Sequence, residues 1–344
     1  MIYFGYLFFL FVVLAIERNS LKWRKFCRFL IPVVYMFLIG FRGKSIGKDT
    51  ETYYEHYYNF GLWGCDFVER GFDWINRIMF SWGCNANDFF LVNAAITLFF
   101  IYLSLNRLKK NYTVTAFCMY LLSFTFLVNG MRQGVACGMF IYAYKFIEDR
   151  KPLPYVLILL LASQFHASSI MLIPLYLLGN KHLSDKLYFI IFIFSFIGLF
   201  VNLSSYVPSL ELLGRDYSNY VENMRIVDAS YLGFTVSSVL NVIVLILMLK
   251  NQIHKQYPLL FNLIFFSFVL KNLGFSMPVI GRVTIYFSWF VYYIYPIILS
   301  KNSKSLFNSM YITRFIIIGI ITVMWFNNLF SKANMLMPYK FYWE

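Results

Sequence analysis

The stretch FFLVNAAITLFFIYLSLNRLKKNYTVTAFCMYLLSFTFLVNGMRQG, residues 89–134, decides the fold of this chain. It holds two apolar runs, 89–106 and 112–129, on either side of the short basic turn RLKK. Each run is close to the ~20 residues with which an α-helix crosses a hydrocarbon core ~30 Å thick. The pattern therefore predicts two membrane-spanning helices joined by a turn on the cytoplasmic side.

The composition extends this pattern to the whole chain. Of its 344 residues, 60% are hydrophobic, 22% aromatic and only 13% charged, and the mean hydropathy is +0.63. Ten further apolar runs lie near 2–16, 29–41, 134–147, 153–165, 168–179, 187–206, 231–249, 258–275, 283–300 and 311–330. We predict an all-α, polytopic integral membrane helix bundle of about 12 transmembrane segments (range roughly 10–12) that forms one transmembrane domain over 1–344. The first run lacks a basic leading region and a small-residue cleavage site, so we expect no signal peptide.

The net charge of +14 gives the topology. Eighteen of the thirty Lys and Arg fall in alternate loops, which the positive-inside rule assigns to the cytoplasm. Twelve of the sixteen Asp and Glu fall in the opposite loops or the tail. We therefore expect both termini outside, together with extracytoplasmic loops over 42–88 and 207–230. The excess charge is a topology signal and gives no reason to expect nucleic-acid binding.

The first of these outer loops contains VERGFDWINRIMFSW, residues 68–82. Phe67, Trp74, Ile78 and Trp82 recur there at helical spacing, and charged residues take the other faces. This pattern predicts an amphipathic helix in the outer membrane interface. Such a helix either braces the bundle or forms the lid or floor of a cleft that opens towards lipid, and the sequence leaves both open.

The cysteines and histidines show little site chemistry. Cys65 and Cys84 both lie in the first outer loop, where an oxidising compartment would permit a disulfide between them. The four histidines show no zinc-ligand spacing with the cysteines, so we expect no metal and no cofactor.

Two ionisable side chains lie where lipid is expected. Arg132 in NGMRQG (129–134) and His166 in SQFHASS (163–169) follow or interrupt apolar runs, and such groups are costly enough at that depth to suggest function. The topology places both on the outer side. The same side holds the further polar candidates Arg42, Asp49, Arg215, Asp216, Arg282 and Lys340. We therefore expect a single extracytoplasmic site.

Short motifs, in a fixed order, resemble those of the EpsG-like family, which includes Wzy-type polymerases of O-antigen and of capsular or exopolysaccharide. The matching residues are Arg42, Gly43, Gly47, Asp49, Thr50, Tyr54, Glu69, Gly71, Phe72, Arg132, Gln133, Phe165, His166, Ser168, Ser169, Arg282, Pro338 and Tyr339. Each motif is weak alone, and the resemblance lies in their order over nearly the whole chain. One departure is GKD at 47–49, where a small residue is more usual after the glycine, but Asp49 is kept.

The resemblance implies a membrane glycosyltransferase. It would pass a growing glycan from undecaprenyl pyrophosphate to the non-reducing end of a lipid-linked repeat unit at the outer leaflet of the bacterial inner membrane. The implied partners are the undecaprenyl-pyrophosphate-linked oligosaccharide, the bilayer, a chain-length regulator and a flippase.

The chemistry of that reaction assigns roles to the candidates. A pyrophosphate leaving group needs positive charge, which arginine supplies with paired donors. We expect Arg132 to be catalytic and Arg42, Arg282 and Arg215 to bind substrate, with Gln133 as a neutral donor. Arg132 could instead be a clamp between helices, and Arg42 and Arg282 could reach to lipid headgroups from helix ends.

A base is also needed near the acceptor hydroxyl. His166 is the first candidate, because its unperturbed pKa lies nearest neutrality, although a structural histidine is an alternative. The competing carboxylates are Asp49, Glu69 and Asp216, and Asp49 could also be a helix cap. Tyr54 could stack on sugar rings.

Other membrane functions fit parts of this pattern. A flippase or transporter would show charges along a midplane path and symmetry between the two halves, neither of which is visible here. An O-antigen ligase would share the donor and differ only in its acceptor. A sugar acyltransferase would need a histidine deep in a span, whereas His166 is expected near the outer surface.

Overall fold

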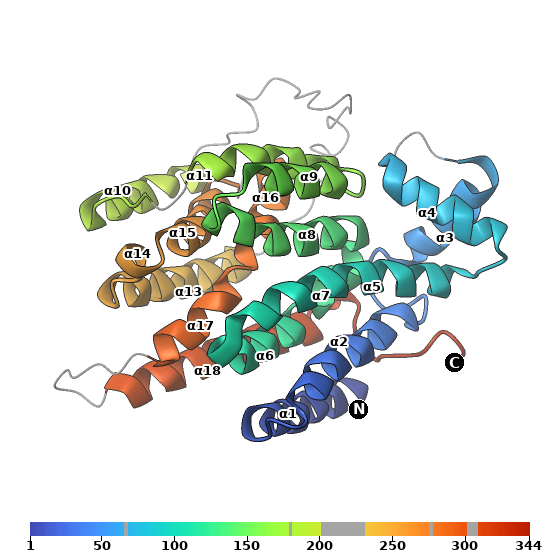
Figure 1. Cartoon of the computed structure of the whole chain (residues 1–344), viewed down its shortest axis with the longest axis horizontal. Helices are drawn as coiled ribbons and strands as arrows, with labels where there is room; N and C mark the ends of the chain where they lie inside the picture. Colours follow the sequence, from blue (N-terminus) through green and yellow to red (C-terminus); the bar gives the residue numbers. More distant parts are fainter. Residues whose placement is uncertain (65–67, 179–180, 201–230, 275–277, 301–308) are drawn as a thin grey trace. The chain divides into compact units, whose positions relative to one another are not determined.

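A computed structural model describes residues 1–64, 68–178, 181–200, 231–274, 278–300 and 309–344. These residues form helices joined by turns, and the only strand-like feature among them is an isolated antiparallel bridge between Arg42 and Phe341. The predicted all-helical fold is confirmed for this part of the chain (Figure 1).

The chain divides into two compact units, one formed by Met1–Ile173 with Tyr295–Glu344 and the other by Pro174–Ile294. The first contains α1 (Ile2–Asn19), α2 (Arg24–Gly40), α3 (Thr50–Trp63), α4 (Arg70–Ser81), α5 (Ala86–Leu105), α6 (Tyr112–Leu122), α7 (Phe124–Asn129), α8 (Met131–Glu148), α9 (Pro152–Ser163) and α18 (Ser309–Phe330). The second contains α10 (Asp185–Ser195), α11 (Ile197–Phe200), α13 (Tyr231–Lys250), α14 (Ile253–Gln256), α15 (Pro258–Leu273) and α16 (Pro278–Ser288). The 3-10 segment Ala167–Leu177 and helix α17 (Val291–Ser300) run across the boundary. The expected single domain over 1–344 stays a prediction.

Helix lengths support only part of the predicted span count. Within the described residues, Ile2–Asn19 and Ala86–Leu108 are long and apolar enough to cross a bilayer, and six further apolar helices are shorter. Several predicted spans are interrupted: 112–129 is divided at Ser123 between α6 and α7, and the described part of 168–179 lies mostly in the 3-10 segment Ala167–Leu177. The figure of about 12 spans therefore stays a prediction.

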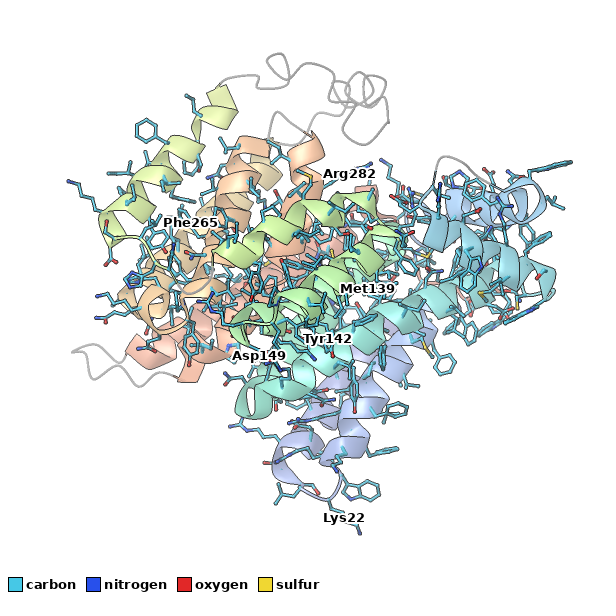
Figure 2. All side chains as sticks on the ribbon, turned by 45° about the horizontal axis from the view of Figure 1, so that its top comes forward. Lys22, Met139, Tyr142, Asp149, Phe265 and Arg282 are labelled. Atoms are coloured by element: carbon cyan, nitrogen blue, oxygen red, sulfur yellow. The ribbon has the colours of Figure 1, made fainter. Side chains whose placement is uncertain are left out.

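The core of the first unit is built on α8. This helix packs against α5 and α9, and α5 also packs against α2. Gly138 makes the α5–α8 approach possible, since a Cβ there would lie 2.8 Å from the Thr97 carbonyl oxygen. Small residues at helix contacts are typical of membrane bundles. Figure 2 shows Met139 and Tyr142 along α8 and Asp149 at its end.

Polar contacts mark two opposite ends of the first unit. At one end, Glu17 is buried, accepts from both Arg28 Nε (2.9 Å) and Arg28 Nη2 (2.7 Å), and receives the Thr113 hydroxyl at 2.7 Å. This is the end of the basic turns, including the α1–α2 turn that carries Lys22 (Figure 2). The other end brings together the end of α2, α3, α4 and the starts of α5 and α8.

The loop 42–88 contains two helices, α3 and α4, which pack against each other. The predicted amphipathic helix is present as α4, and its place in the membrane interface stays a prediction. Phe72, Asn76 and Met79 are buried, whereas Trp74 is 65% and Trp82 77% exposed. Exposed tryptophans at a helix surface suit a membrane interface. Residue Phe67 lies outside the described residues.

In the second unit, α15 packs against α10 and α16. Tyr188 donates to Asn262 at 2.6 Å, and its ring lies against Phe261 and Phe265. The buried ring of His254 reaches Asp185 at 2.8 Å. The loop 207–230 lies outside the described residues.

Candidate functional site

Glu69, Arg132 and His166 form one polar cluster in the first unit. One carboxylate oxygen of Glu69 accepts from Arg132 Nη1 at 2.8 Å. The other lies 3.5 Å from His166 Nδ1 and accepts the backbone N–H of Ala167 at 3.1 Å. The sequence motifs ERGF, MRQG and FHASS thus meet at a single carboxylate.

Three helix ends position these side chains. Glu69 is the residue before α4, Arg132 stands in the first turn of α8 after the break at Gly130, and His166 follows the end of α9. The α4 backbone lies directly against the end of α9, where Phe72 N–H donates to the Gln164 carbonyl at 3.1 Å. Gly71 permits this approach, because a Cβ there would lie 2.7 Å from Gln164 Cβ.

The Glu69 carboxylate stays ionised in this setting. Burial alone raises its pKa, but the His166 hydrogen bond, the Arg132 charge and the Ala167 N–H together lower the pKa to about 2. Its side chain is 5% exposed, whereas that of Arg132 is 26% exposed. The buried Glu69 carboxylate therefore orients the Arg132 guanidinium, which is partly exposed.

Helix α3 supplies two further residues, one turn apart on the same face. Arg132 donates to the Tyr53 hydroxyl. Burial raises the pKa of Tyr53, partly offset by the Arg132 charge. Burial and the Arg132 charge lower the pKa of His56, three residues further along α3. From the sequence alone, Tyr53 is a candidate for stacking on sugar rings, like Tyr54, and His56 has no assigned role. Their i, i+3 spacing would have placed the two side chains on one face of a helix.

Arg42 is enclosed by protein. It is fully buried and donates to Thr50 Oγ1 (3.0 Å), the Ile39 carbonyl (2.5 Å) and the Val128 carbonyl (3.1 Å), with its guanidinium 4.4 Å from the Phe90 ring centroid. Burial lowers its pKa to about 10, against the influence of nearby tyrosines, so it remains cationic near neutrality. A substrate would reach it only by displacing these partners, and its predicted contact with substrate stays untested.

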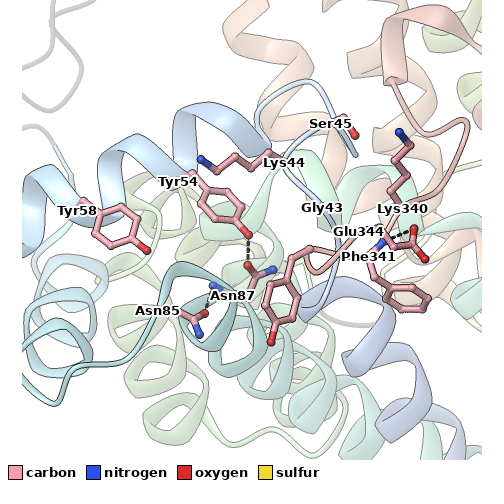
Figure 3. A pocket seen from close by; sticks show the side chains of 11 residues that line it. Gly43, Lys44, Ser45, Tyr54, Tyr58, Asn85, Asn87, Lys340, Phe341 and Glu344 are labelled. Carbon is pink, nitrogen blue, oxygen red and sulfur yellow. Dashed lines mark hydrogen bonds between the residues drawn. The ribbon is translucent and has the colours of Figure 1, made fainter.

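The remaining candidates of the first unit lie around this cluster. Asp49 is the exposed residue before α3, and its N–H donates to Asn129 Oδ1 at 3.3 Å, but its side chain makes no cap hydrogen bond to α3. Gln133 is buried beside Arg132 in α8. Tyr54 is buried, donates to Asn87 and lines a pocket (Figure 3) that Tyr53 does not line.

Other expectations fall elsewhere. Arg282 is half-buried in α16 of the second unit. Arg215 and Asp216 lie outside the described residues, as does Cys65, so the predicted Cys65–Cys84 disulfide stays a prediction. Within the described ranges, no group of three or more His, Cys, Asp or Glu is arranged to hold a metal ion.

The family assignment follows from the whole length of the chain. The EpsG family model matches residues 25–341, a range that includes Glu69, Arg132 and His166. The chain belongs to the EpsG family. The family is a Wzy-type, polysaccharide polymerase-like family. Family membership and the apolar helices together indicate a membrane protein. No curated protein and no solved structure matches it.

Proposed function

We propose that this EpsG-family protein polymerises a surface polysaccharide, and that Glu69, Arg132 and His166 form its reaction centre. The proposal narrows the polymerase-like function of the family to one reaction. A growing glycan on undecaprenyl pyrophosphate is transferred to the non-reducing end of a lipid-linked repeat unit at the outer leaflet of the cytoplasmic membrane. The observation that carries it is the convergence of a guanidinium and an imidazole on one buried carboxylate.

The bond changes define what the centre must do. The bond between the anomeric carbon of the donor and its pyrophosphate oxygen breaks, and a bond from the acceptor hydroxyl oxygen to that carbon forms. The bonding electrons leave with undecaprenyl pyrophosphate, and the hydroxyl proton goes to a base. Catalysis therefore needs positive charge on one side of the reacting carbon and a proton acceptor on the other.

Arg132 suits the leaving-group side. A guanidinium has five N–H donors in a planar fork, and the bonds to Glu69 and Tyr53 use only part of this set. Its partial exposure gives phosphate oxygens access to the remaining donors. Glu69 and Tyr53 fix the orientation of the fork before substrate arrives.

His166 suits the acceptor side. The Glu69 carboxylate beside Nδ1 orients the ring, favours the tautomer with Nε2 as the proton acceptor and stabilises the imidazolium that forms. Nε2 is buried in this structure, so the proposal requires the site to open for the acceptor hydroxyl to reach it. Glu69 itself is a weak base, because its pKa is about 2. Glu69 is therefore assigned a positioning role, and Asp49 stays the alternative base.

The test is the surface-polysaccharide profile of the host without this gene, complemented with wild type, Arg132→Ala, His166→Ala or Glu69→Gln. Wild type should restore a ladder of chain lengths, and the three variants should leave lipid carrying a single repeat. Arg107→Ala is the matched control, because Arg107 lies at the other end of the first unit, beside Glu148 and Asp149. This control should restore the ladder.

Two outcomes would overturn the proposal. A ladder of normal length in the strain without the gene would remove the polymerase function. Loss of even the single repeat would indicate a flippase or a ligase. Equal protein levels of all variants in the membrane fraction, measured by immunoblot, ensure that a lost ladder reports lost activity.

A further inference from the structure

Two pockets of similar size adjoin the carboxyl-terminal tail of the first unit and share Ser45 and Lys340 in their walls. The aromatic pocket has a volume of about 470 Å³ and is lined among others by Lys44, Tyr54, Tyr58, Asn87, Lys340 and Tyr342 (Figure 3). The apolar pocket has a volume of about 460 Å³ and is lined among others by Leu329, Phe330, Lys332, Met335, Leu336 and Met337. Volumes of this size are usual for small-molecule sites.

The walls of both pockets are fixed by the backbone of the tail. Gly43 N–H donates to the Lys340 carbonyl at 2.9 Å, Tyr342 N–H to the Phe41 carbonyl at 3.1 Å, and Gly47 N–H to the Met335 carbonyl at 2.8 Å. A Cβ on Gly43 would lie 3.2 Å from the Phe341 carbonyl oxygen, so the glycine permits the close approach of the tail. The pockets therefore belong to a built structure and are not gaps beside a loose end.

Lysines stand in the walls of both pockets: Lys44 and Lys340 line the aromatic pocket, and Lys332 and Lys340 line the apolar pocket. Lys44, Lys332 and Lys340 are exposed, and none of them forms an ion pair with a carboxylate of the described residues. The Lys44 ammonium lies 5.1 Å from the Tyr54 ring centroid. Glu344 accepts the N–H of Phe341 at 3.2 Å. These lysines share an end of the unit with Arg42, which is opposite to the end with the basic turns, so the positive-inside preference does not account for them.

The two pockets together fit a molecule with three chemical parts. An apolar chain matches the Leu, Phe and Met side chains, a phosphate group matches Lys44 and Lys340, and sugar rings match the exposed ring of Tyr58. A water-soluble sugar phosphate would leave the apolar pocket empty, and an ordinary phospholipid would leave the aromatic pocket empty. A lipid-linked saccharide has a part that matches each pocket.

We infer that these two pockets bind a lipid-linked saccharide phosphate, with its phosphate between Lys44 and Lys340, its apolar chain in the apolar pocket and its first sugars in the aromatic pocket. This assignment rests on the proposed polymerase function for its role as the second substrate of the reaction. Both sites adjoin α3, because Tyr53 contacts Arg132 and the next residue, Tyr54, lines the aromatic pocket. The helix thus stands between the reaction centre and this second site.

The test measures binding to the purified full-length protein in detergent with three probes: farnesyl pyrophosphate, inorganic pyrophosphate and farnesol. Farnesyl pyrophosphate should bind at least tenfold more tightly than either of its halves, because only it uses both the lysines and the apolar pocket. The double variant Lys44→Gln/Lys340→Gln should weaken farnesyl pyrophosphate binding at least tenfold. Phe330→Ser should weaken farnesyl pyrophosphate and farnesol but leave pyrophosphate unchanged.

Lys48→Gln is the matched control, since Lys48 is exposed in the same loop as Lys44 but does not line either pocket. It should bind all three probes as wild type does. Unchanged affinity for farnesyl pyrophosphate in the double lysine variant would overturn the inference, and so would equal loss in Lys48→Gln. Tighter binding of inorganic pyrophosphate than of farnesyl pyrophosphate would mean a free-phosphate site and would also overturn it.

Turnover separates this inference from the proposed function. With purified lipid-linked repeats, the double lysine variant should raise the KM at least tenfold while kcat changes little, whereas Arg132→Ala should lower kcat. Lysine-dependent binding without any polymerisation by wild type would overturn the proposed function and keep the second site. Unchanged KM and kcat of polymerisation in the double lysine variant would overturn the second site and keep the proposed function.

Discussion

Glu69 determines the arrangement of the reaction centre because Arg132 and His166 both contact its carboxylate. Its two oxygens face different partners, Arg132 on one side and His166 with the Ala167 N–H on the other. Removing a buried anion that joins two donors leaves both without their acceptor, which costs more than the bonds themselves are worth. The position of both catalytic candidates therefore depends on a residue that need not touch substrate.

The depressed pKa of Glu69 predicts a specific pH dependence of stability. Its pKa falls from an ordinary 4.5 to about 2, so the stabilisation from its ionised form is fully present above about pH 4.5 and is lost as the pH falls towards 2. We expect Glu69→Gln to unfold at a lower temperature than wild type at pH 7. The difference should narrow steadily below pH 4.5, as measured by thermal unfolding in detergent.

The control for this prediction is Asp73→Asn, since Asp73 pairs with the exposed Arg77 at 2.8 Å within one helix turn. Exposed pairs of this kind contribute little, so this variant should unfold close to the wild-type temperature. A Glu69→Gln difference that stays constant from pH 7 to pH 3 would contradict the assignment of the pKa shift to this residue.

Arg42 should behave as a structural residue. Arg42→Ala leaves the carbonyls of Ile39 and Val128 without a donor and opens a cavity at a fully buried position, which typically costs about 2–5 kcal/mol. We expect a clear loss of folded protein in detergent, measured by gel filtration and thermal unfolding. Arg132→Lys, which keeps a positive charge beside the buried Glu69, should keep the folded yield and lose activity, because an ammonium lacks the planar fork of the guanidinium. Normal folding of Arg42→Ala together with lost polymerisation would instead return Arg42 to the substrate site.

The sequence singled out the three residues of the cluster as candidates, but it did not predict which of them contact one another. ERGF, RQG and FHASS each supplied one member of the cluster, and depth in the membrane identified Arg132 and His166. What it could not predict is which carboxylate meets them, because Asp49, Glu69 and Asp216 were equally placed on one expected face. That choice depends on the packing of α4 against the end of α9, a contact between residues far apart in the chain.

Among the helices, α3 was the least predictable and matters the most. Its sequence, TETYYEHYYNFGLW, has no apolar stripe of helical period, so it gives little sign of an amphipathic helix. Tyrosines on different faces of this helix make different contacts. Tyr57 is buried and donates to the Cys84 carbonyl at 2.8 Å, whereas Tyr53 contacts Arg132. By contrast, α4 follows helical periodicity and the long helices α1 and α5 are continuous apolar runs, so these helices were predicted.

The start of α3 depends on the turn at Gly47. This residue has φ +92°, a conformation that side chains other than glycine rarely adopt, and a Cβ there would lie 2.3 Å from Val128 Cγ1. Gly47→Ala should therefore destabilise the protein by about 1–3 kcal/mol and loosen the contact of the 41–49 loop with the tail. Thermal unfolding measures the first effect.

The second effect is measured by limited proteolysis of the tail, which should become faster in Gly47→Ala. Gly5→Ala is the control, since a Cβ there meets nothing within 4 Å. Equal protease sensitivity of the two variants would show that the tail does not rely on this turn.

At the scale of the whole molecule, the first unit separates its polar residues into two ends. The Glu17 cluster and the basic α1–α2 turn lie at one end, and Arg42, the Glu69 cluster and the two pockets lie at the other. The alternation of apolar runs predicted this separation, since each crossing reverses the chain. The number of crossings was harder to predict, because helix breaks such as that at Ser123 leave the apolar run continuous in sequence while interrupting the helix.

This separation predicts which end faces outward. In a variant with Cys65→Ser and Cys84→Ser, Lys48→Cys should react with a membrane-impermeant maleimide in intact cells, and Lys22→Cys should react only after lysis. The other native thiols, Cys27, Cys118 and Cys137, are buried and give little background. The positive-inside rule requires this result, because the basic loops share the end of Lys22. Labelling of Lys22→Cys in intact cells would turn the reaction centre towards the cytoplasm, where an undecaprenyl-linked polymer could not be extended on the outer leaflet, and the proposed reaction would then have to be abandoned.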